Sequence, residues 1–143
     1  MTFQTLTPEE MLARLVGFDS VVGRPNAPII DFLRDGLSAQ GLRVHVLPGP
    51  EGDRANLLCT IGPQDRPGYV LSGHLDVVPA SEPGWRGDPF SLRTEDERLI
   101  GRGACDMKGF VAAALAMVPE LVRMRLRAPK WLCRLMDKIP GPA

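Results

Sequence analysis

A histidine and two aspartates are the residues whose types and spacing could carry chemistry in this chain. His74 and Asp76 lie two positions apart within residues 71–79, and Asp106 follows later within residues 101–109. If the backbone is extended here, the first two side chains point to the same face. A neutral imidazole can give one nitrogen to a metal ion while a nearby carboxylate orients the ring. The pair suits a metal site, although an isolated His-x-Asp is more typical of a strand end and a turn.

Asp106 can be interpreted in two ways. It follows a Gly-Arg-Gly segment at residues 101–103 and precedes an apolar run. The glycines permit a tight approach of the backbone, and a carboxylate at this point has two oxygens that could bridge two cations. Alternatively, Asp106 is only the N-cap of the helix expected after it, a role worth about 1 kcal/mol. The residue by itself leaves both interpretations open.

Two helices are predicted before these motifs. Thr7, Pro8 and Glu10 form the pattern of a helix start with a capping box, and apolar residues then recur at helical spacing. A Gly-Arg-Pro-Asn cluster at residues 23–26 ends this helix. A second helix is predicted over residues 27–40, with a glycine directly after it.

Three short strands follow, each bounded by glycine and proline clusters. They are predicted at residues 43–47, 56–61 and 69–72. The third is nearly all apolar, which predicts a central position in the sheet. Together with the helix expected after Asp106, these elements indicate an α/β fold with a mixed sheet flanked by helices. His74 then lies where a strand end can present a ligand.

The composition is that of a globular protein of one domain. The chain has 143 residues, of which 44% are hydrophobic and 24% charged. Lys plus Arg equals Asp plus Glu at 17 each, which argues against a nucleic-acid surface. No apolar run reaches the roughly 18 residues that a membrane span needs. The first residues have no signal-peptide pattern, so we expect a cytoplasmic protein without a membrane partner.

The motifs, in their order and spacing, resemble a known family. Residues 72–79, Trp85, residues 88–90 and residues 101–109 are similar to motifs of the acetylornithine deacetylase, succinyl-diaminopimelate desuccinylase, aminoacylase and carboxypeptidase family of zinc metallohydrolases. The resemblance covers about residues 7–127. It implies the N-terminal part of a dinuclear-zinc, aminopeptidase-like catalytic domain. Within the family, segments such as Arg-Ala-Asn-Leu-Leu at 54–58 look most like acetylornithine deacetylase.

The resemblance also implies roles for the three residues. His74 would ligate one zinc ion, and Asp106 would bridge two metal ions, with cobalt as an alternative metal. Asp76 would be the catalytic-site residue that orients the His74 ring or the site around it, and the peptide bond between Asp106 and Met107 would be cis. The implied reaction is hydrolysis of a small N-acyl amino acid, N-acetylornithine to ornithine and acetate in arginine biosynthesis. A different acyl group, as in succinyl-diaminopimelate desuccinylase, is the alternative. Full-length relatives are expected to be homodimers.

The sequence departs from the family pattern after Asp106. The family takes its general base and next ligand from a Glu-Glu pair, but here only Glu120 and Asp137 follow, and no histidine follows His74. Two protein ligands are too few for a stable zinc site, which takes three or four. We therefore expect this chain alone to be inactive. The competing hypothesis is a non-catalytic α/β fragment or binding module.

The end of the chain prompts a further hypothesis. Residues 1–129 are interpreted as the N-terminal part of the catalytic domain, and residues 130–143 as a divergent tail from a truncation or frameshift. The family pattern predicts a strand there, leading to the Glu-Glu pair.

Three other features receive structural interpretations. His45 is predicted to be a solvated strand residue, because Val44 and Val46 alternate with it. Cys105 has no base adjacent in sequence and is interpreted as a small packed residue. The basic residues within 123–134 are interpreted as a solvated tail. The three cysteines, odd in number and without a C-x-x-C spacing, are expected to be reduced.

Overall fold

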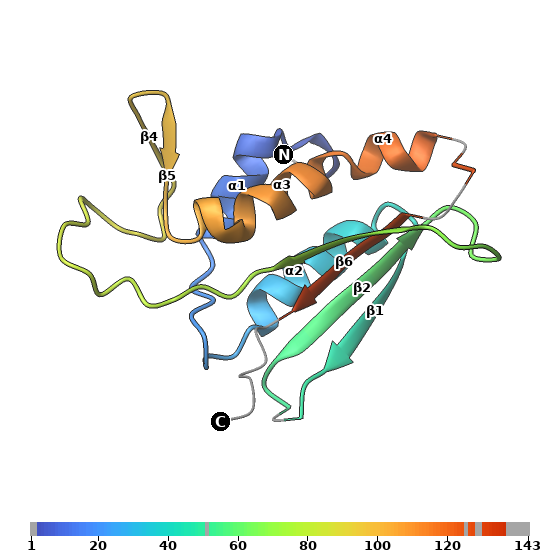
Figure 1. Cartoon of the computed structure of the whole chain (residues 1–143), viewed down its shortest axis with the longest axis horizontal. Helices are drawn as coiled ribbons and strands as arrows, with labels where there is room; N and C mark the ends of the chain where they lie inside the picture. The colour runs from blue at the N-terminus through green and yellow to red at the C-terminus, as the bar shows by residue number, and fades with distance from the viewer. Residues whose placement is uncertain (1–2, 51, 125, 128–129, 137–143) are drawn as a thin grey trace.

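The computed structural model describes residues 3–50, 52–124, 126–127 and 130–136, the last range as backbone only. In this part of the chain, helices and strands build a mixed α/β fold (Figure 1). The helices are α1 (Pro8–Val16), α2 (Ala27–Ser38), α3 (Gly109–Ala116) and α4 (Val118–Arg123), with a 3-10 turn at Phe3–Thr5. The strands are β1 (Arg43–Pro48), β2 (Ala55–Ile61), β3 (Tyr69–His74), β4 (Arg93–Glu95), β5 (Arg98–Ile100) and β6 (Lys130–Met136).

Helix α1 begins with the predicted capping box. The Glu10 backbone N–H donates to Thr7 Oγ1 at 3.2 Å, and the Thr7 N–H donates to Glu10 Oε2 at 2.8 Å. The helix buries Met11, Leu12, Leu15 and Val16, the apolar residues at helical spacing. The predicted first helix is therefore confirmed in its start and in its buried face.

Helix α2 is also confirmed, although it ends two residues earlier than predicted. The Asn26 side chain before it makes no cap bond but pairs with the backbone of Ala55, accepting from its N–H at 2.9 Å and donating to its carbonyl at 3.0 Å. This amide therefore ties the start of α2 to the start of β2.

The main sheet is mixed, with the strand order β1-β2-β6-β3. The pairs β1–β2 and β2–β6 are antiparallel, and β6 runs parallel to β3. The prediction that the third strand is central is wrong, because β3 forms an edge of this sheet in the described part of the chain. Its first residues, Tyr69 and Val70, are 74% and 59% exposed. An apolar run indicates burial on both faces only when neighbouring strands and helices cover it, and these two residues are left uncovered.

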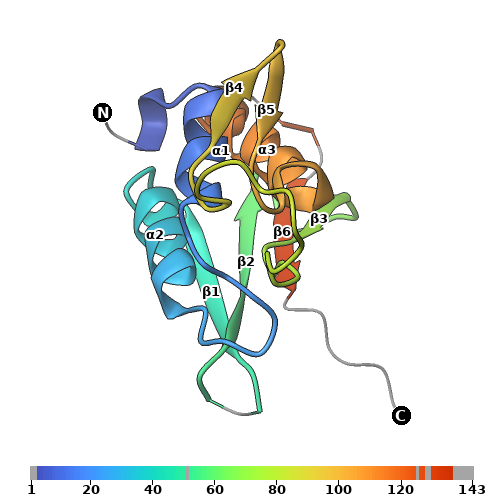
Figure 2. The ribbon, with the colours of Figure 1, turned by 90° about the vertical axis from the view of Figure 1, so that its left-hand side faces the viewer.

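The hydrophobic core lies between one face of the sheet and the helices. Leu57, Cys59 and Ile61 alternate along β2, so their side chains share one face, and all three are buried. Helix α2 packs on β1 and β2, whereas α3 packs on α1 and β3 (Figure 2). The predicted mixed sheet with helical cover is thus confirmed.

A small hairpin of β4 and β5, which the sequence interpretation missed, stands apart from the main sheet (Figure 1). Its turn holds Asp96 and Glu97 with φ of 48° and 60°. Two positive φ angles in a two-residue loop are typical of a hairpin turn that glycine or asparagine normally occupies, so the usual sequence signal is absent.

Strand β6 occupies the region that was interpreted as a divergent tail. Its backbone lies between β2 and β3 in the sheet. A strand at this point of the chain is what the family pattern predicted. Residues 137–143 lie outside the described residues, so the division at residue 130 stays a prediction.

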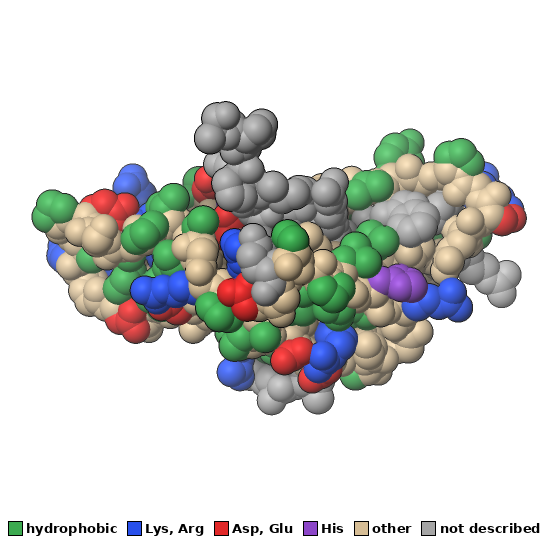
Figure 3. All heavy atoms as spheres, turned by 90° about the horizontal axis from the view of Figure 1, so that it is seen from below, with side chains coloured by type: hydrophobic (Ala, Val, Ile, Leu, Met, Phe, Trp, Pro, Cys, Tyr) green, Lys and Arg blue, Asp and Glu red, His purple; other side chains and the backbone are tan. Residues whose placement is uncertain are grey.

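The surface shows both signs of charge. On the face in Figure 3, Lys and Arg side chains are interspersed with Asp and Glu, and hydrophobic side chains lie among them. Among the described residues, no helix is long and apolar enough to cross a lipid bilayer.

Candidate metal centre

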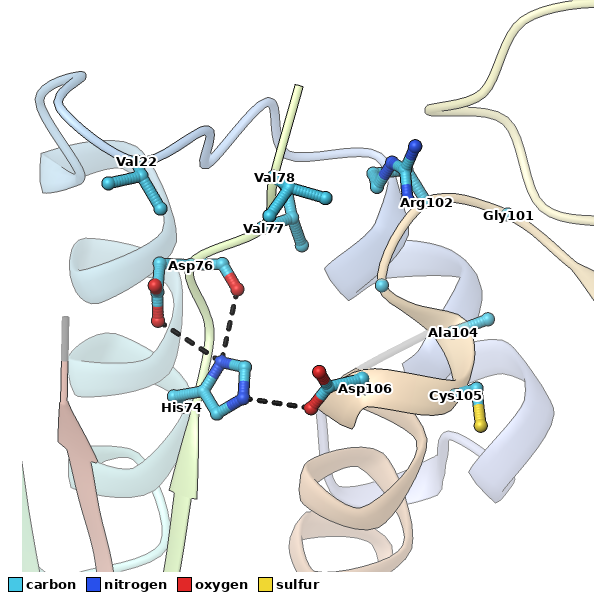
Figure 4. A pocket seen from close by; sticks show the side chains of 11 residues that line it. Val22, His74, Asp76, Val77, Val78, Gly101, Arg102, Ala104, Cys105 and Asp106 are labelled. Carbon is cyan, nitrogen blue, oxygen red and sulfur yellow. Dashed lines mark hydrogen bonds and ion pairs between the residues drawn. The ribbon is translucent and has the colours of Figure 1, made fainter. Parts of the chain in front are cut away.

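His74 and Asp76 lie where β3 ends and the chain enters an extended segment. His74 is the last residue of β3, and the next residues pair with the loop after α1 through a parallel bridge between Val21 and Val77. This pairing keeps the backbone extended beyond the strand. Both side chains consequently point into one cavity of about 270 Å³, which Asp106 also lines (Figure 4).

One nitrogen of the His74 ring faces Asp76. His74 Nδ1 lies 3.1 Å from the backbone oxygen of Asp76 and 3.1 Å from its Oδ1. The Asp76 side chain is only 4% exposed, and its Oδ1 lacks a hydrogen bond of good geometry among the described residues despite this short distance. Both neighbours of Nδ1 are acceptors, so the tautomer with its proton on Nδ1 would donate a hydrogen bond on this side of the ring.

The other ring nitrogen faces Asp106. His74 Nε2 lies 3.0 Å from Asp106 Oδ1, and the Asp106 side chain is 87% exposed (Figure 4). In the tautomer with its proton on Nε2, this nitrogen donates a hydrogen bond to the carboxylate. In the tautomer with its proton on Nδ1, the Nε2 lone pair faces the carboxylate oxygen, an arrangement that a cation would stabilise.

Asp106 comes from an irregular turn, Ala104–Lys108, directly before α3. The dihedral angles of Asp106 and Met107 are not helical, and the peptide bond between them is cis, as the family resemblance implied. The N-cap position of α3 is Lys108, and no side chain caps that helix end. The interpretation of Asp106 as only an N-cap is therefore wrong, because its carboxylate is directed to the imidazole instead.

Gly103 permits this turn. It has φ of 77°, which other L-residues rarely adopt, and a Cβ on it would lie 2.4 Å from Cγ1 of Val77. The close approach of residue 103 to Val77 brings the segment of Asp106 next to the segment of His74 and Asp76.

The donors fit a divalent metal ion in kind but are few. An imidazole nitrogen such as His74 Nε2 and a carboxylate oxygen such as Asp106 Oδ1 are ligands that suit zinc or cobalt. Within the described residues, however, no group of three or more His, Cys, Asp or Glu side chains could hold a metal ion. The three side chains therefore fall short of a complete metal site within the described part of the chain.

Lys108 is a site neighbour that the sequence interpretation missed. Its side chain is fully buried, and its Nζ donates to the carbonyl oxygens of Leu15 at 2.8 Å and Phe18 at 3.0 Å. Burial lowers the pKa of the Lys108 ammonium to about 8, and the charge of Asp19 partly offsets this effect. The one feature of the sequence that could have indicated this role is the presence of a lysine in an otherwise apolar run after Asp106.

Arg102 is a second missed neighbour. It lines the cavity, and its guanidinium binds both carboxylate oxygens of Glu82 and lies 5.1 Å from the centre of the Trp85 ring. The bond from Arg102 lowers the pKa of Glu82 to about 2, helped by backbone and Trp85 N–H donors. This cluster fixes the loop that contains Trp85 beside the cavity.

The remaining predictions have mixed outcomes. His45 is exposed on β1, as predicted. The prediction that Cys105 is packed is wrong: it is exposed and lines the cavity, because the turn directs it outward. Arg123 and Arg127 are exposed, in line with a solvated segment. Arg125 and the side chains of residues 130–134 lie outside the described residues.

Comparison with known proteins shows which family this arrangement resembles. The model of peptidase family M20/M25/M40 matches residues 70–132, which include His74, Asp76 and Asp106. Acetylornithine deacetylase of Pasteurella multocida (strain Pm70) is 42% identical over 115 residues, which cover 79% of this chain and 30% of the relative. Acetylornithine deacetylase of Yersinia pseudotuberculosis serotype O:1b (strain IP 31758) is 34% identical over 125 residues, covering 84% of this chain and 32% of the relative. Over residues 70–132, the chain is therefore similar to peptidase family M20/M25/M40.

A solved M20 structure shows the same fold. The M20 family metallo-carboxypeptidase Sso-CP2 from Sulfolobus solfataricus superimposes with a TM-score of 0.74 at 22% identity, over 90% of this chain and 30% of that one. The chain thus spans about a third of the length of the M20 proteins it matches.

Proposed function

We propose that this chain is the N-terminal part of a zinc-dependent amide hydrolase of the M20 family that deacetylates N-acetylornithine to ornithine and acetate. The observation that carries the proposal is the convergence of His74 Nε2 and Asp106 Oδ1 at 3.0 Å, with the opposite ring nitrogen held by Asp76. The names of the deacetylase relatives support the substrate.

Each of the three residues has a distinct task in this proposal. His74 would hold a metal ion through Nε2, and the exposed carboxylate of Asp106 would supply oxygen ligands for the metal centre. The backbone carbonyl of Asp76 would accept from Nδ1, and its buried carboxylate lies 3.1 Å from the same nitrogen, so this residue would fix the tautomer and the ring orientation. When bound, the metal ions would supply a Lewis acid for the amide carbonyl and an activated water.

The matching proposal is that these 143 residues alone do not turn over substrate. They contain no Glu-Glu pair after Asp106 and no histidine after His74, so a general base and further ligands are missing. Release of acetate from N-acetylornithine, measured with added zinc or cobalt against a metal-only blank, is expected to stay at the blank rate. Turnover above the blank would refute this part of the proposal.

Metal binding is the sharper test of the site. Calorimetric titration with zinc is expected to show weak binding that is lost in His74→Ala and in Asp106→Ala. His45→Ala and Asp31→Ala are matched controls, because both residues are exposed and lie outside the cavity. Equal affinity in all five proteins would contradict the proposal.

Such a result would favour the second candidate, a non-catalytic α/β fragment or binding module. The observation on its side is that no group of three metal-binding side chains exists among the described residues. Within the hydrolase proposal, a succinyl group in place of acetyl is the alternative substrate, and parallel assays with both N-acyl amino acids would distinguish them. We further propose a cytoplasmic protein, acting on a small molecule in arginine biosynthesis and homodimeric as a full-length enzyme.

A further inference from the structure

We infer that the turn formed by residues 15–20, at the C-terminal end of α1, positions the metal centre. It acts through two positioning residues, which are Ser20 within the turn and Lys108, whose side chain binds the turn. The inference rests on the proposed function, in which His74 and Asp106 share a metal ion. These two ligands come from segments far apart in the sequence, and the turn binds both segments directly.

Lys108 links the turn to the segment of Asp106. Its buried Nζ donates to the carbonyl oxygens of Leu15 and Phe18, at 2.8 and 3.0 Å. Its backbone N–H donates to the Gly103 carbonyl at 2.9 Å, which closes the irregular turn that holds Asp106. A single residue therefore connects the end of α1 with the backbone that aims the Asp106 carboxylate.

Ser20 links the same turn to the segment of His74. Its buried Oγ donates to the Leu75 carbonyl at 2.6 Å, and its carbonyl accepts from the Val77 N–H at 2.9 Å. These two bonds flank Asp76 in the chain and keep the backbone extended directly after His74. The position of the imidazole is thus tied to residue 20.

The turn itself is fixed by packing. The Phe18 ring lies 5.5 Å from the ring of Phe32 on α2, and Leu15 and Val16 are fully buried. The segment of His74 and the segment of Asp106 are consequently both hydrogen-bonded to the same packed stretch of six residues, 15–20. We attribute the 3.0 Å approach of His74 Nε2 to Asp106 Oδ1 to this shared attachment.

The identity of residue 108 supports a positioning role over simple space filling. An aliphatic side chain would occupy an apolar interior without the desolvation cost of an amine. Lysine at this position instead supplies N–H donors to the carbonyl oxygens of Leu15 and Phe18, which also accept from the backbone N–H groups of Phe18 and Ser20.

The first test uses NMR spectroscopy of the metal-free protein. It measures the nitrogen and proton chemical shifts of the two imidazole rings, those of His45 and His74. In Ser20→Ala and in Lys108→Met, the His74 signals are expected to shift, whereas those of exposed His45 stay in place as an internal reference. Ser38→Ala, an exposed serine, and Ile29→Val, a buried residue of α2, are the controls for chemistry and for lost stability. If His74 moves equally in the controls, or in none of the variants, the inference is wrong.

The second test measures zinc affinity in the same proteins. Each of Ser20→Ala and Lys108→Met is expected to weaken binding about tenfold, the range for groups that orient a ligand without touching the metal. The double variant should lose less than the product of the two, because either break already releases one segment from the turn. Ser20→Thr, which keeps the hydroxyl, should restore affinity.

The two tests separate this inference from the proposed function. If the unaltered chain binds no zinc but its His74 signals respond to Ser20→Ala, the proposed metal site fails and the positioning role stands. If the chain binds zinc and neither variant changes the affinity or the His74 signals, the positioning role fails. Should Lys108→Met not fold, Ser20→Ala alone decides the outcome.

Discussion

At the scale of residues, the site depends on which oxygen each nitrogen of His74 meets. Asp76 is buried against Nδ1 and Asp106 is exposed at Nε2, so two carboxylates of the same type have different surroundings. The spacing of His74 and Asp76 predicted that these two side chains share a face, whereas the place of Asp106 beside them was implied by the family resemblance. The sequence left the role of Asp106 open, since an N-cap and a metal ligand have the same residue type in the same place.

The residues that the sequence did not predict are those whose role is to connect segments. Lys108 binds carbonyl oxygens of Leu15 and Phe18, and Arg102 binds Glu82, all distant in sequence from their partners. No local pattern encodes such a contact, because the partner is a backbone carbonyl or a loop carboxylate brought near by the fold. Only the unusual presence of a charge in an apolar run gave a signal.

The pair of Glu82 and Arg102 makes a testable prediction at this scale. The Arg102 guanidinium lowers the pKa of Glu82 from 4.5 to about 2. A carboxyl whose pKa is lowered in the folded state contributes stability above pH 4.5, and this contribution is lost as the pH falls toward 2. The fluorescence of Trp85, whose Nε1 donates to the same carboxylate, is expected to stay constant from pH 7 to 4.5 and to change only below it.

Two variants complete that measurement. Glu82→Gln should remove the transition, and Trp131→Phe leaves Trp85 as the single source of the signal, since the chain has two tryptophans. A midpoint close to 4.5 would mean that the carboxylate is not held by Arg102.

At the scale of elements, hydrophobic spacing and caps predicted α1, α2 and the strands β1, β2 and β3. The predicted position of β3 in the sheet was wrong. Its apolar run favours a strand with a neighbouring strand on each side, but the order of strands depends on pairings between distant segments. The β4–β5 hairpin was missed for a local reason. Its turn residues, Asp96 and Glu97, adopt positive φ although neither is glycine.

Gly103 provides a prediction about the element that holds Asp106. Gly103→Ala is expected to destabilise the fold by more than the roughly 1–2 kcal/mol cost of a left-handed residue, because its Cβ would also meet Val77 at 2.4 Å. Gly52→Ala is the matched control, since Gly52 has φ of 78° and nothing within 4 Å of its Cβ. Urea unfolding of both variants measures the difference, and equal losses would contradict the close contact.

At the scale of the whole molecule, the chain presents a core covered by helices and a sheet with two edges. Helices α1, α2, α3 and α4 contribute to one continuous cluster with β2, so the layer of helices and the sheet stabilise each other. Charges of both signs are interspersed on the face in Figure 3, which gives no extended basic surface there for nucleic acid. What the sequence could not predict at this scale is which strand edges remain uncovered.

The β3 edge leads to a prediction about association. Tyr69 and Val70 are 74% and 59% exposed at the start of this strand, and an exposed apolar edge is a template for pairing with another chain. We expect the chain to self-associate as its concentration rises, and Val70→Lys to shift it toward the monomer, because a lysine on an edge strand opposes pairing. Sedimentation velocity over a concentration series measures the effect. Val122→Lys, at an exposed position of α4, is the control. The same shift toward the monomer in Val122→Lys would mean that association depends on general surface hydrophobicity. If Val70→Lys associates as strongly as the unaltered chain, the β3 edge is not the site of association.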